Sequence, residues 1–277
     1  MALVTLVNHA VSGGEVVDPV RRAVTRLIRV EGTLRRITVA LDRDGVDVET
    51  EATGERELEA IAEKVRFWFD LDTDLEPVET SLGADPHLEP LVKQRPGLRV
   101  TRHPEGFEAT IGAVLGQQVS LAAGRTFSAR LLEACGTPGP AGLTAFPAPD
   151  RLAGESAARI QEAVGLTGAR TRTVLAVAGL FASGFMIGPG VDPVDARASL
   201  LALPGVGPWT TDYLAIRAME DSDSFPVGDA VLRRALGGGS HREMAARSSR
   251  WAPWRSYAAT HLWAAAADPA WLPIAPA

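Results

Sequence analysis

A short stretch near residue 205 constrains this chain more than any other. Two glycines flank one apolar residue in Gly205-Val206-Gly207, and neither has a Cβ, so the backbone of this turn can approach an anion such as phosphate closely. Pro208 stands where a helix would have its first residue, and apolar side chains follow it at helical spacing. The free N–H groups and the positive end of that helix would face the same anion. With residues 196–203 as a preceding helix, the stretch predicts two helices joined by an anion-binding turn.

A Gly-Asp pair downstream supplies a candidate for chemistry. Asp229 ends the run Phe225-Pro-Val-Gly-Asp and opens a helical pattern over 229–236. An aspartate in this position is an ordinary helix N-cap. A catalytic role is compatible with that one, because amide groups and the helix dipole stabilise a charged carboxylate at a helix N-terminus.

The two stretches together resemble the helix-hairpin-helix-GPD superfamily of DNA glycosylases. The tryptophan after Gly-Val-Gly-Pro makes the chain most similar to the AlkA-like DNA-3-methyladenine glycosylase II family. Further agreement lies in residues 95–98, 106–108, 111–120 and 251–263, and the resemblance is dense from about Arg95 to Trp263. It implies a base-excision-repair enzyme that flips a damaged nucleotide out of double-stranded DNA and hydrolyses the N-glycosidic bond of alkylated purines, chiefly 3-methyladenine and 7-methylguanine.

The resemblance also assigns roles at the reacting centre. Asp229 would stabilise the oxocarbenium-like sugar or activate the attacking water. Trp209, Tyr213 and Trp263 would line the base pocket, where aromatic faces attract a cationic alkylated purine; core packing is the alternative for each of them. Bifunctional members of the superfamily carry a Schiff-base lysine where this chain has Trp209, so no lyase activity is expected.

DNA contacts are expected from the turn and from a wedge that fills the gap left by the flipped base. The resemblance places DNA-binding residues at Gly205, Val206, Gly207, Pro208 and Thr210, and the wedge at Gln118. Solvation of a helix end is the alternative for Gln118, which some relatives replace with leucine. Ala230 stands where some relatives have an aromatic residue, which implies a wider pocket there. The carbonyls of Leu203, Gly205 and Val206 resemble a sodium or potassium site; no catalytic metal or other cofactor is implied.

Charge and cysteine content narrow the interpretation. The net charge is −6, but residues 1–100 hold 19 Asp+Glu and 13 Lys+Arg, whereas residues 101–277 hold 15 of each. The acidic excess therefore belongs to the front of the chain. The lysines are Lys64 and Lys93, so phosphate contacts in the helical region must come from arginine, main-chain amides and helix ends. A single cysteine, Cys135, excludes a disulfide framework and a four-cysteine iron–sulfur cluster, and either inert packing or a surface position is expected for it.

The sequence predicts an α+β protein with a small antiparallel sheet followed by an all-helical region. Strands are expected at 24–30, 34–41 and 46–50 and a helix at 55–69, which gives an AlkA-like N-terminal α/β domain over 1–85, shortened at its start. The glycosylase domain would span 86–277 in two subdomains flanking the DNA cleft. Its helices are expected at 107–118, 120–134, 149–154, 156–163, 169–183, 193–203, 208–219, 229–236 and 250–266. The proline-rich residues 77–104 would link the domains, and Asp70–Asp74 would form a solvated connection. Residues 1–19 are expected to be a short apolar start and a Gly-Gly loop, Glu31-Gly32 and Asp44-Gly45 are hairpin signals, and the glycines at 237–239 mark a break before the last helix, in which His261 is expected to pack.

No signal peptide, membrane span or lipidation motif is evident, so a cytoplasmic monomer with double-stranded DNA as its partner and no membrane contact is expected. Two alternatives stay open from the sequence. One is a glycosylase of other specificity, for oxidised, deaminated or mismatched bases. The other is a catalytically silent protein that binds damaged DNA.

Overall fold

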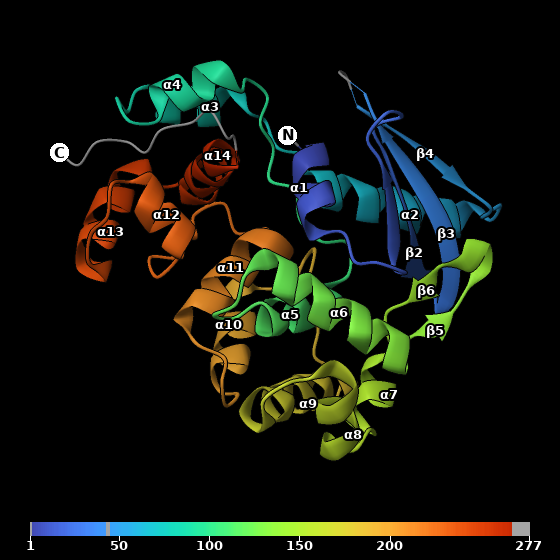
Figure 1. The fold of residues 1–277 in the computed structure, drawn as a ribbon. Coiled ribbons are helices and arrows are strands. Elements are labelled where there is room, and N and C mark those ends of the chain that lie inside the picture. Colours follow the sequence, from blue (N-terminus) through green and yellow to red (C-terminus); the bar gives the residue numbers. More distant parts are fainter. Residues whose placement is uncertain (1, 43–44, 268–277) are drawn as a thin grey trace.

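The computed structural model describes residues 2–42 and 45–267, and its N-terminal part contains a four-stranded antiparallel sheet (Figure 1). Its strands follow the chain order β1 (Glu15–Asp18), β2 (Ala23–Val30), β3 (Thr33–Leu41) and β4 (Val46–Thr50). Alternate residues of β2 and β3, among them Ile28 and Ile37, bury their side chains against helices α1 (Ala2–His9) and α2 (Glu55–Phe69). The predicted meander is confirmed, and β1 adds a strand at its edge.

Helices make up nearly all of the rest. In chain order they are α3 (Glu76–Gly83), α4 (Glu89–Gln94), α5 (Gly106–Leu115), α6 (Leu121–Cys135), α7 (Pro149–Ala153), α8 (Ala157–Val164), α9 (Gly168–Ala182), α10 (Pro193–Leu201), α11 (Pro208–Ala218), α12 (Ala230–Ala235), α13 (His241–Ser248) and α14 (Arg255–Ala266). A short antiparallel hairpin pairs the two-residue strands β5 (Thr137–Pro138) and β6 (Thr144–Ala145). Two 3-10 turns, Pro140–Gly142 and Ser249–Trp251, complete the described elements. The predicted α+β class is confirmed.

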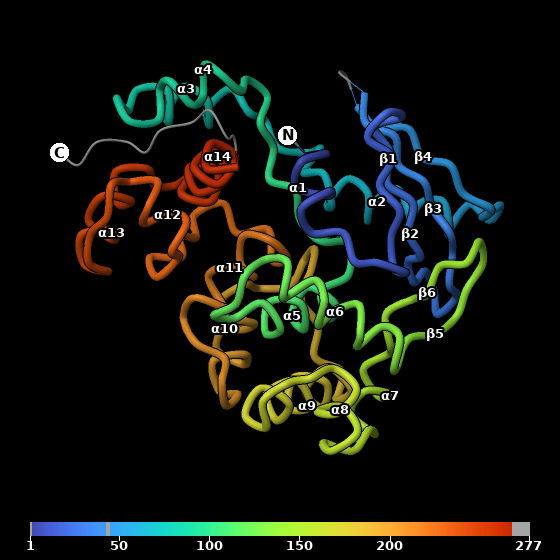
Figure 2. Tube along the Cα trace, viewed as in Figure 1, coloured from blue at the N-terminus to red at the C-terminus, as the bar shows by residue number. Residues whose placement is uncertain are grey.

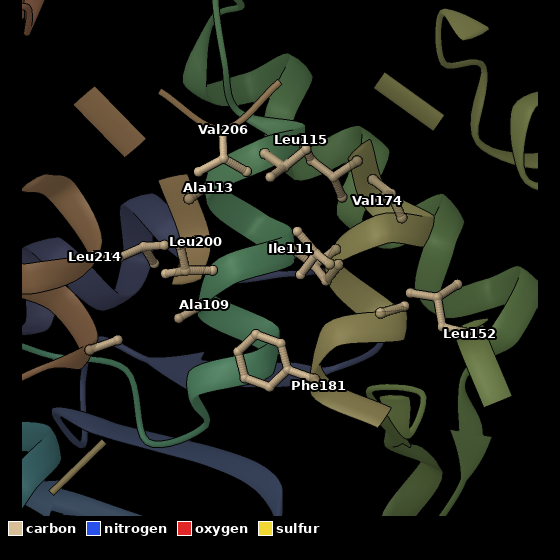
Figure 3. Close-up of a cluster of buried hydrophobic side chains, with 14 of the residues drawn as sticks. Ala109, Ile111, Ala113, Leu115, Leu152, Val174, Phe181, Leu200, Val206 and Leu214 are labelled. Carbon is tan, nitrogen blue, oxygen red and sulfur yellow. The ribbon is translucent and has the colours of Figure 1, made fainter. Parts of the chain in front are cut away.

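The helices divide between two hydrophobic cores. The first helical subdomain comprises α5 to α11, and Ile111, Leu115 and Val174 are fully buried in its centre (Figure 3). The second helical subdomain comprises α3, α4 and α12 to α14, where Leu82 and Leu262 are fully buried. Burying each such side chain stabilises the fold by about 1.5–3 kcal/mol.

The second helical subdomain is assembled from two separate parts of the sequence. Figure 2 shows the trace leaving the sheet, passing through α3 and α4 beside α14, and only then entering α5. Residues 77–104 are therefore not a plain linker as expected, because they contain two helices packed into a core. The domain boundary predicted at residues 85 and 86 falls between α3 and α4.

Two other segments differ from the sequence prediction. Residues 1–19 were expected to be an apolar start and a loop, yet α1 and β1 lie there. Helix α13 follows the Gly237–Gly239 break, where no helix was predicted. Cys135 is buried, which is the packed rather than the surface placement, and His261 is buried within α14 as expected.

Asp70 is buried rather than solvated, which corrects the expectation for Asp70–Asp74. It takes a left-handed conformation (φ 56°) at the end of α2, and this turns its carboxylate inward. There it accepts hydrogen bonds from Arg102 (2.9 Å) and from the Tyr257 hydroxyl of α14 (2.8 Å). Burial, together with the charge of Asp70, raises the pKa of Tyr257 to about 12. Asp70 thus joins the end of α2 to the second helical subdomain.

A second buried polar group joins the sheet to the first helical subdomain. Arg26 of β2 donates to Glu108 of α5 (2.5 Å), lies 3.5 Å from Glu15, and places its guanidinium 5.6 Å from the ring centre of Trp68. One arginine faces several carboxylates here. Burial, and repulsion from Glu15 and Glu105, raise the pKa of Glu108 to about 7.

Candidate active site at the junction of the helical subdomains

The predicted turn forms the tip of the α10–α11 hairpin. Gly205 has φ +83°, and a Cβ there would come within 2.2 Å of the Thr173 hydroxyl oxygen on α9, so only glycine fits. Val206 points into the core beneath the turn, as Figure 3 shows. Gly207 is the N-cap of α11, with open space where a side chain would be, and Pro208 takes the first turn. The main-chain N–H groups at the start of α11 are therefore presented with no side chain of residue 207 in front of them.

Asp229 lies at the junction of the two helical subdomains, where it caps α12. Its side chain is 8% exposed and accepts hydrogen bonds from four N–H groups. The Val231 and Leu232 amides (both 2.9 Å) and the Trp263 indole (3.2 Å) donate to Oδ1, whereas the Trp209 indole (3.0 Å) donates to Oδ2. Asp229 is therefore a helix N-cap, and the same arrangement is compatible with the predicted catalytic role. Because a carboxylate oxygen accepts about two hydrogen bonds, Oδ2 is the oxygen with capacity left for a substrate or water.

The three predicted pocket aromatics surround this carboxylate. Trp209 and Tyr213 belong to α11 of the first helical subdomain, and Trp263 belongs to α14 of the second. The rings of Trp209 and Tyr213 are stacked, with centroids 5.4 Å apart and planes 14° apart, and Trp263 meets Tyr213 edge to face at 6.0 Å. All three side chains are only partly buried. Because each indole also donates to Asp229, the orientation of both tryptophan rings is fixed relative to the carboxylate.

Gln118 occupies the tip of the turn between α5 and α6. It is exposed and has φ +55°, a left-handed conformation that a bulky residue seldom adopts. This position is compatible with a wedge.

The neighbouring Gln117 is a site residue that the sequence analysis did not assign. Its side-chain amide nitrogen donates to the Gly205 carbonyl (3.0 Å) and to the Thr210 hydroxyl (2.9 Å). Arg170 in turn donates a hydrogen bond to the main-chain carbonyl of Gln117. Gln117 therefore connects the Gln118 turn to the α10–α11 hairpin. Its position next to the predicted wedge was the only signal in the sequence.

Two of the predicted DNA-binding and cation-binding features have partners within the chain. Thr210 is 2% exposed, so it faces the hairpin interior rather than the surface. The Gly205 carbonyl accepts from Gln117, and the Leu203 carbonyl accepts from the Val206 amide (3.2 Å). Across residues 2–42 and 45–267, no group of His, Cys, Asp and Glu side chains is placed to hold a metal ion.

A cavity of about 400 Å³ lies elsewhere on α10 and α11 and is lined by ion pairs. Arg197 forms an ion pair with Asp212. Arg255 forms a bidentate ion pair with Asp223, in which Nε donates to Oδ1 and a terminal guanidinium nitrogen donates to Oδ2, both at 2.7 Å. Burial raises the pKa of Asp212. Asp221 also lines the cavity, 3.6 Å from Arg197, so two arginines face three aspartates in an ion-pair network that includes neither Asp229 nor the three aromatic residues.

Comparison with known proteins identifies the family. The AlkA N-terminal domain family matches residues 3–105. DNA-3-methyladenine glycosylase 2 of Escherichia coli (strain K12) is 32% identical over 209 residues, which are 74% of this chain and 71% of that protein. The chain belongs to the AlkA family of DNA-3-methyladenine glycosylases.

Other AlkA-family relatives extend the comparison. The probable bifunctional transcriptional activator/DNA repair enzyme AlkA of Mycobacterium tuberculosis (strain H37Rv) is 41% identical over 217 residues, 75% of this chain. The match spans only 43% of that relative's length. The solved structure of the 3-methyladenine DNA-glycosylase from Archaeoglobus fulgidus has the same fold, with a TM-score of 0.79 at 18% identity over 96% of this chain and 94% of that one.

Among the residues that the structure describes, no helix is both long and apolar enough to span a membrane.

Proposed function

We propose that this chain is a monofunctional DNA glycosylase that removes alkylated purines, 3-methyladenine and 7-methylguanine among them, from double-stranded DNA. The observation that carries the proposal is the Asp229 carboxylate, which lies inside a partly open ring of three aromatic side chains. A hairpin that presents free main-chain amides precedes the ring directly in sequence. A nucleotide held by its phosphate at the hairpin could then place its sugar beside Asp229 and its base among the aromatic rings.

The chemistry follows from what each group offers. As the bond between base and deoxyribose breaks, positive charge builds on the sugar, and the available Oδ2 of Asp229 stabilises it. The same oxygen can accept a proton from the attacking water. An alkylated purine carries positive charge before it leaves, so it is attracted to the aromatic faces by up to about 2 kcal/mol per ring when desolvated, and it departs without a general acid.

A covalent sugar intermediate is not supported by the positions of the lysines. Lys64 binds the Pro104 carbonyl and Glu105 beside the sheet, and Lys93 pairs with Glu89 on α4. Neither amine lies at the pocket, where Trp209 stands instead. Hydrolysis without strand cleavage is therefore the proposed reaction.

The proposal is tested by release of free base from methylated duplex DNA, with Asp229→Asn compared with the native chain. Asparagine caps helices as well as aspartate, so this variant should keep α12 while losing the charge. Asp192→Asn is a matched control, because Asp192 caps α10 through the Val194 amide (2.8 Å) away from the aromatic ring.

We expect Asp229→Asn to lower the rate of base release by about 100-fold or more and Asp192→Asn to leave it unchanged. The native chain should leave abasic sites that break only after alkali. Binding without base release by the native chain would contradict the proposal and indicate a damage-binding protein, and release of oxidised or deaminated bases instead would assign a different specificity.

A further inference from the structure

The side chain of His241, the first residue of α13, lies against the Gly-Asp pair of the pocket. Its Cε1 and Nε2 atoms are both 3.6 Å from the position that a Cβ on Gly228 would occupy. The Cβ of Trp209 is 4.0 Å from the same point. His241 and Trp209 therefore both border the space beside Gly228, the residue that precedes Asp229.

The loop before α13 is built to hold His241 in this place. Gly237, Gly238 and Gly239 have φ values of 76°, 95° and 131°, which reverse the chain in a way that other residues rarely permit. Arg247 donates to the Leu236 carbonyl (2.5 Å) and to the Gly238 carbonyl (3.3 Å) and so fixes the reversal.

The start of α13 is fixed as well. Ser240 and Glu243 form a reciprocal capping box, in which the Ser240 side chain accepts from the Glu243 amide and the Glu243 side chain accepts from the Ser240 amide. The placement of His241 beside Gly228 is thus determined by its own loop and not by its ring.

The ring itself is exposed, and no hydrogen bond or ion pair engages it within residues 2–42 and 45–267. An unused polar ring next to a catalytic carboxylate is available to the substrate. In the proposed reaction the sugar of the damaged nucleotide lies at Asp229 and a phosphate of the same strand lies at the hairpin amides. Because His241 lies close to both Gly228 and Trp209, a strand that runs from the hairpin to Asp229 would pass near its ring.

We propose that His241 donates a hydrogen bond to a phosphodiester oxygen of the strand that carries the damaged base, and so positions the flipped nucleotide over Asp229. This inference rests on the proposed function. The contact would act on binding rather than on bond cleavage, because His241 is not among the four N–H donors that engage the Asp229 carboxylate.

The test measures binding of a fluorescent duplex that carries a tetrahydrofuran abasic-site analogue, together with the single-turnover rate of base release from methylated duplex. His241→Ala and His241→Phe remove the donor, and Phe keeps the ring volume; His241→Gln keeps an N–H donor. His87→Ala is the matched control, because His87 lies in the loop between α3 and α4 and its side chain also lacks a hydrogen-bond partner in the described part of the chain.

We expect His241→Ala and His241→Phe to weaken duplex binding by about five- to tenfold, with the rate at saturating enzyme within about twofold of the native rate. His241→Gln should retain most of the affinity, and His87→Ala all of it. Native affinity in His241→Ala, or full recovery by His241→Phe, would overturn the phosphate contact. A rate loss at saturation with unchanged binding would overturn it too.

Failure of the glycosylase function and failure of the His241 contact give different results. If the native chain releases no base while His241→Ala still weakens binding to the abasic duplex, the proposed function is wrong and the contact stands. If the native chain releases base and His241→Ala binds normally, the contact alone is wrong.

Discussion

Gly205 and Gly207 flank Val206 in the hairpin, but the structure gives each glycine a different reason to be there. Gly205 has a left-handed backbone and presses against Thr173, whereas Gly207 has φ −117° and ψ 177°, with nothing within 4 Å of the position that a Cβ would occupy. Replacing each with alanine should therefore have separable effects. Gly205→Ala should damage the fold, and Gly207→Ala should damage only the approach of DNA.

The size of the Gly205 effect follows from two terms. A left-handed conformation costs a residue with a Cβ about 1–2 kcal/mol. The new methyl group would also lie 2.2 Å from the Thr173 hydroxyl oxygen, which is held by the Pro204 carbonyl (2.9 Å) and the Ala169 carbonyl (3.2 Å). Moving that hydroxyl away forfeits about 1 kcal/mol of hydrogen bonding. Gly205→Ala should lower the free energy of unfolding by about 2–3 kcal/mol, and Gly207→Ala should change it by less than about 0.5 kcal/mol.

Urea unfolding followed by tryptophan fluorescence measures the free energy of unfolding, and titration of a labelled duplex measures DNA binding. For Gly207→Ala we expect native stability with about tenfold weaker binding, since a Cβ keeps a phosphate away from the α11 amides. The reasoning would be refuted if the two variants were equally stable, or if Gly207→Ala bound DNA as the native chain does.

Two further predictions concern Glu108 and Gln117. The pKa of Glu108 is raised to about 7 in the folded protein, so its contribution to stability is complete below its unfolded pKa and is lost as the pH rises through about 7. Between about pH 5 and 8 the stability of the native chain should therefore fall relative to that of Glu108→Gln, by up to about 3 kcal/mol; parallel pH profiles in urea unfolding would disprove this. Gln117→Ala removes the donor to Gly205 and Thr210 and should weaken duplex binding about fivefold. Gln161→Ala, on the exposed face of α8, is the control and should have no effect on binding. Equal binding by both variants would count against a role for Gln117 in holding the hairpin.

Local sequence patterns predicted the elements whose ends are marked by turn or capping residues. Helix α2 spans Glu55–Phe69 as expected, because Gly54 precedes it and apolar residues recur at helical spacing up to the left-handed Asp70. The β2–β3 hairpin follows the Glu31-Gly32 signal, and both residues have positive φ in the structure. The other predicted turn, at Asp44-Gly45, lies partly outside the described residues.

Prolines misled the prediction for α3 and α4. Pro77 and Pro90 were treated as marks of a linker, yet each stands in the first turn of its helix. A proline is tolerated there because the N–H that it lacks would have no partner inside the helix. Whether such a segment is a linker or a helical layer depends on its apolar partners, and those of α3 and α4 come from α12 and α14, far away in the sequence.

The features of the site also separate into those that a local motif predicts and those that depend on contacts between distant segments. Trp209, Tyr213, Trp263 and Asp229 could be selected from the sequence because they belong to motifs, and the structure brings them together. Which oxygen of Asp229 remains available, and the positions of Gln117 and His241, depend on contacts between segments that no spacing rule connects.

Thr173 shows how such a contact can be tested where the sequence is silent. The sequence explains why residue 205 should be glycine but not what lies against it, because Thr173 comes from α9. In a Thr173→Ala background the hydroxyl and methyl groups facing Gly205 are gone, so Gly205→Ala should cost only the backbone term of about 1–2 kcal/mol. A double-mutant cycle should then give a coupling of about 1 kcal/mol between the two positions, with the double variant more stable than the sum of the single effects predicts. Strict additivity would mean that the α9 contact does not restrict residue 205, and that backbone conformation alone requires the glycine.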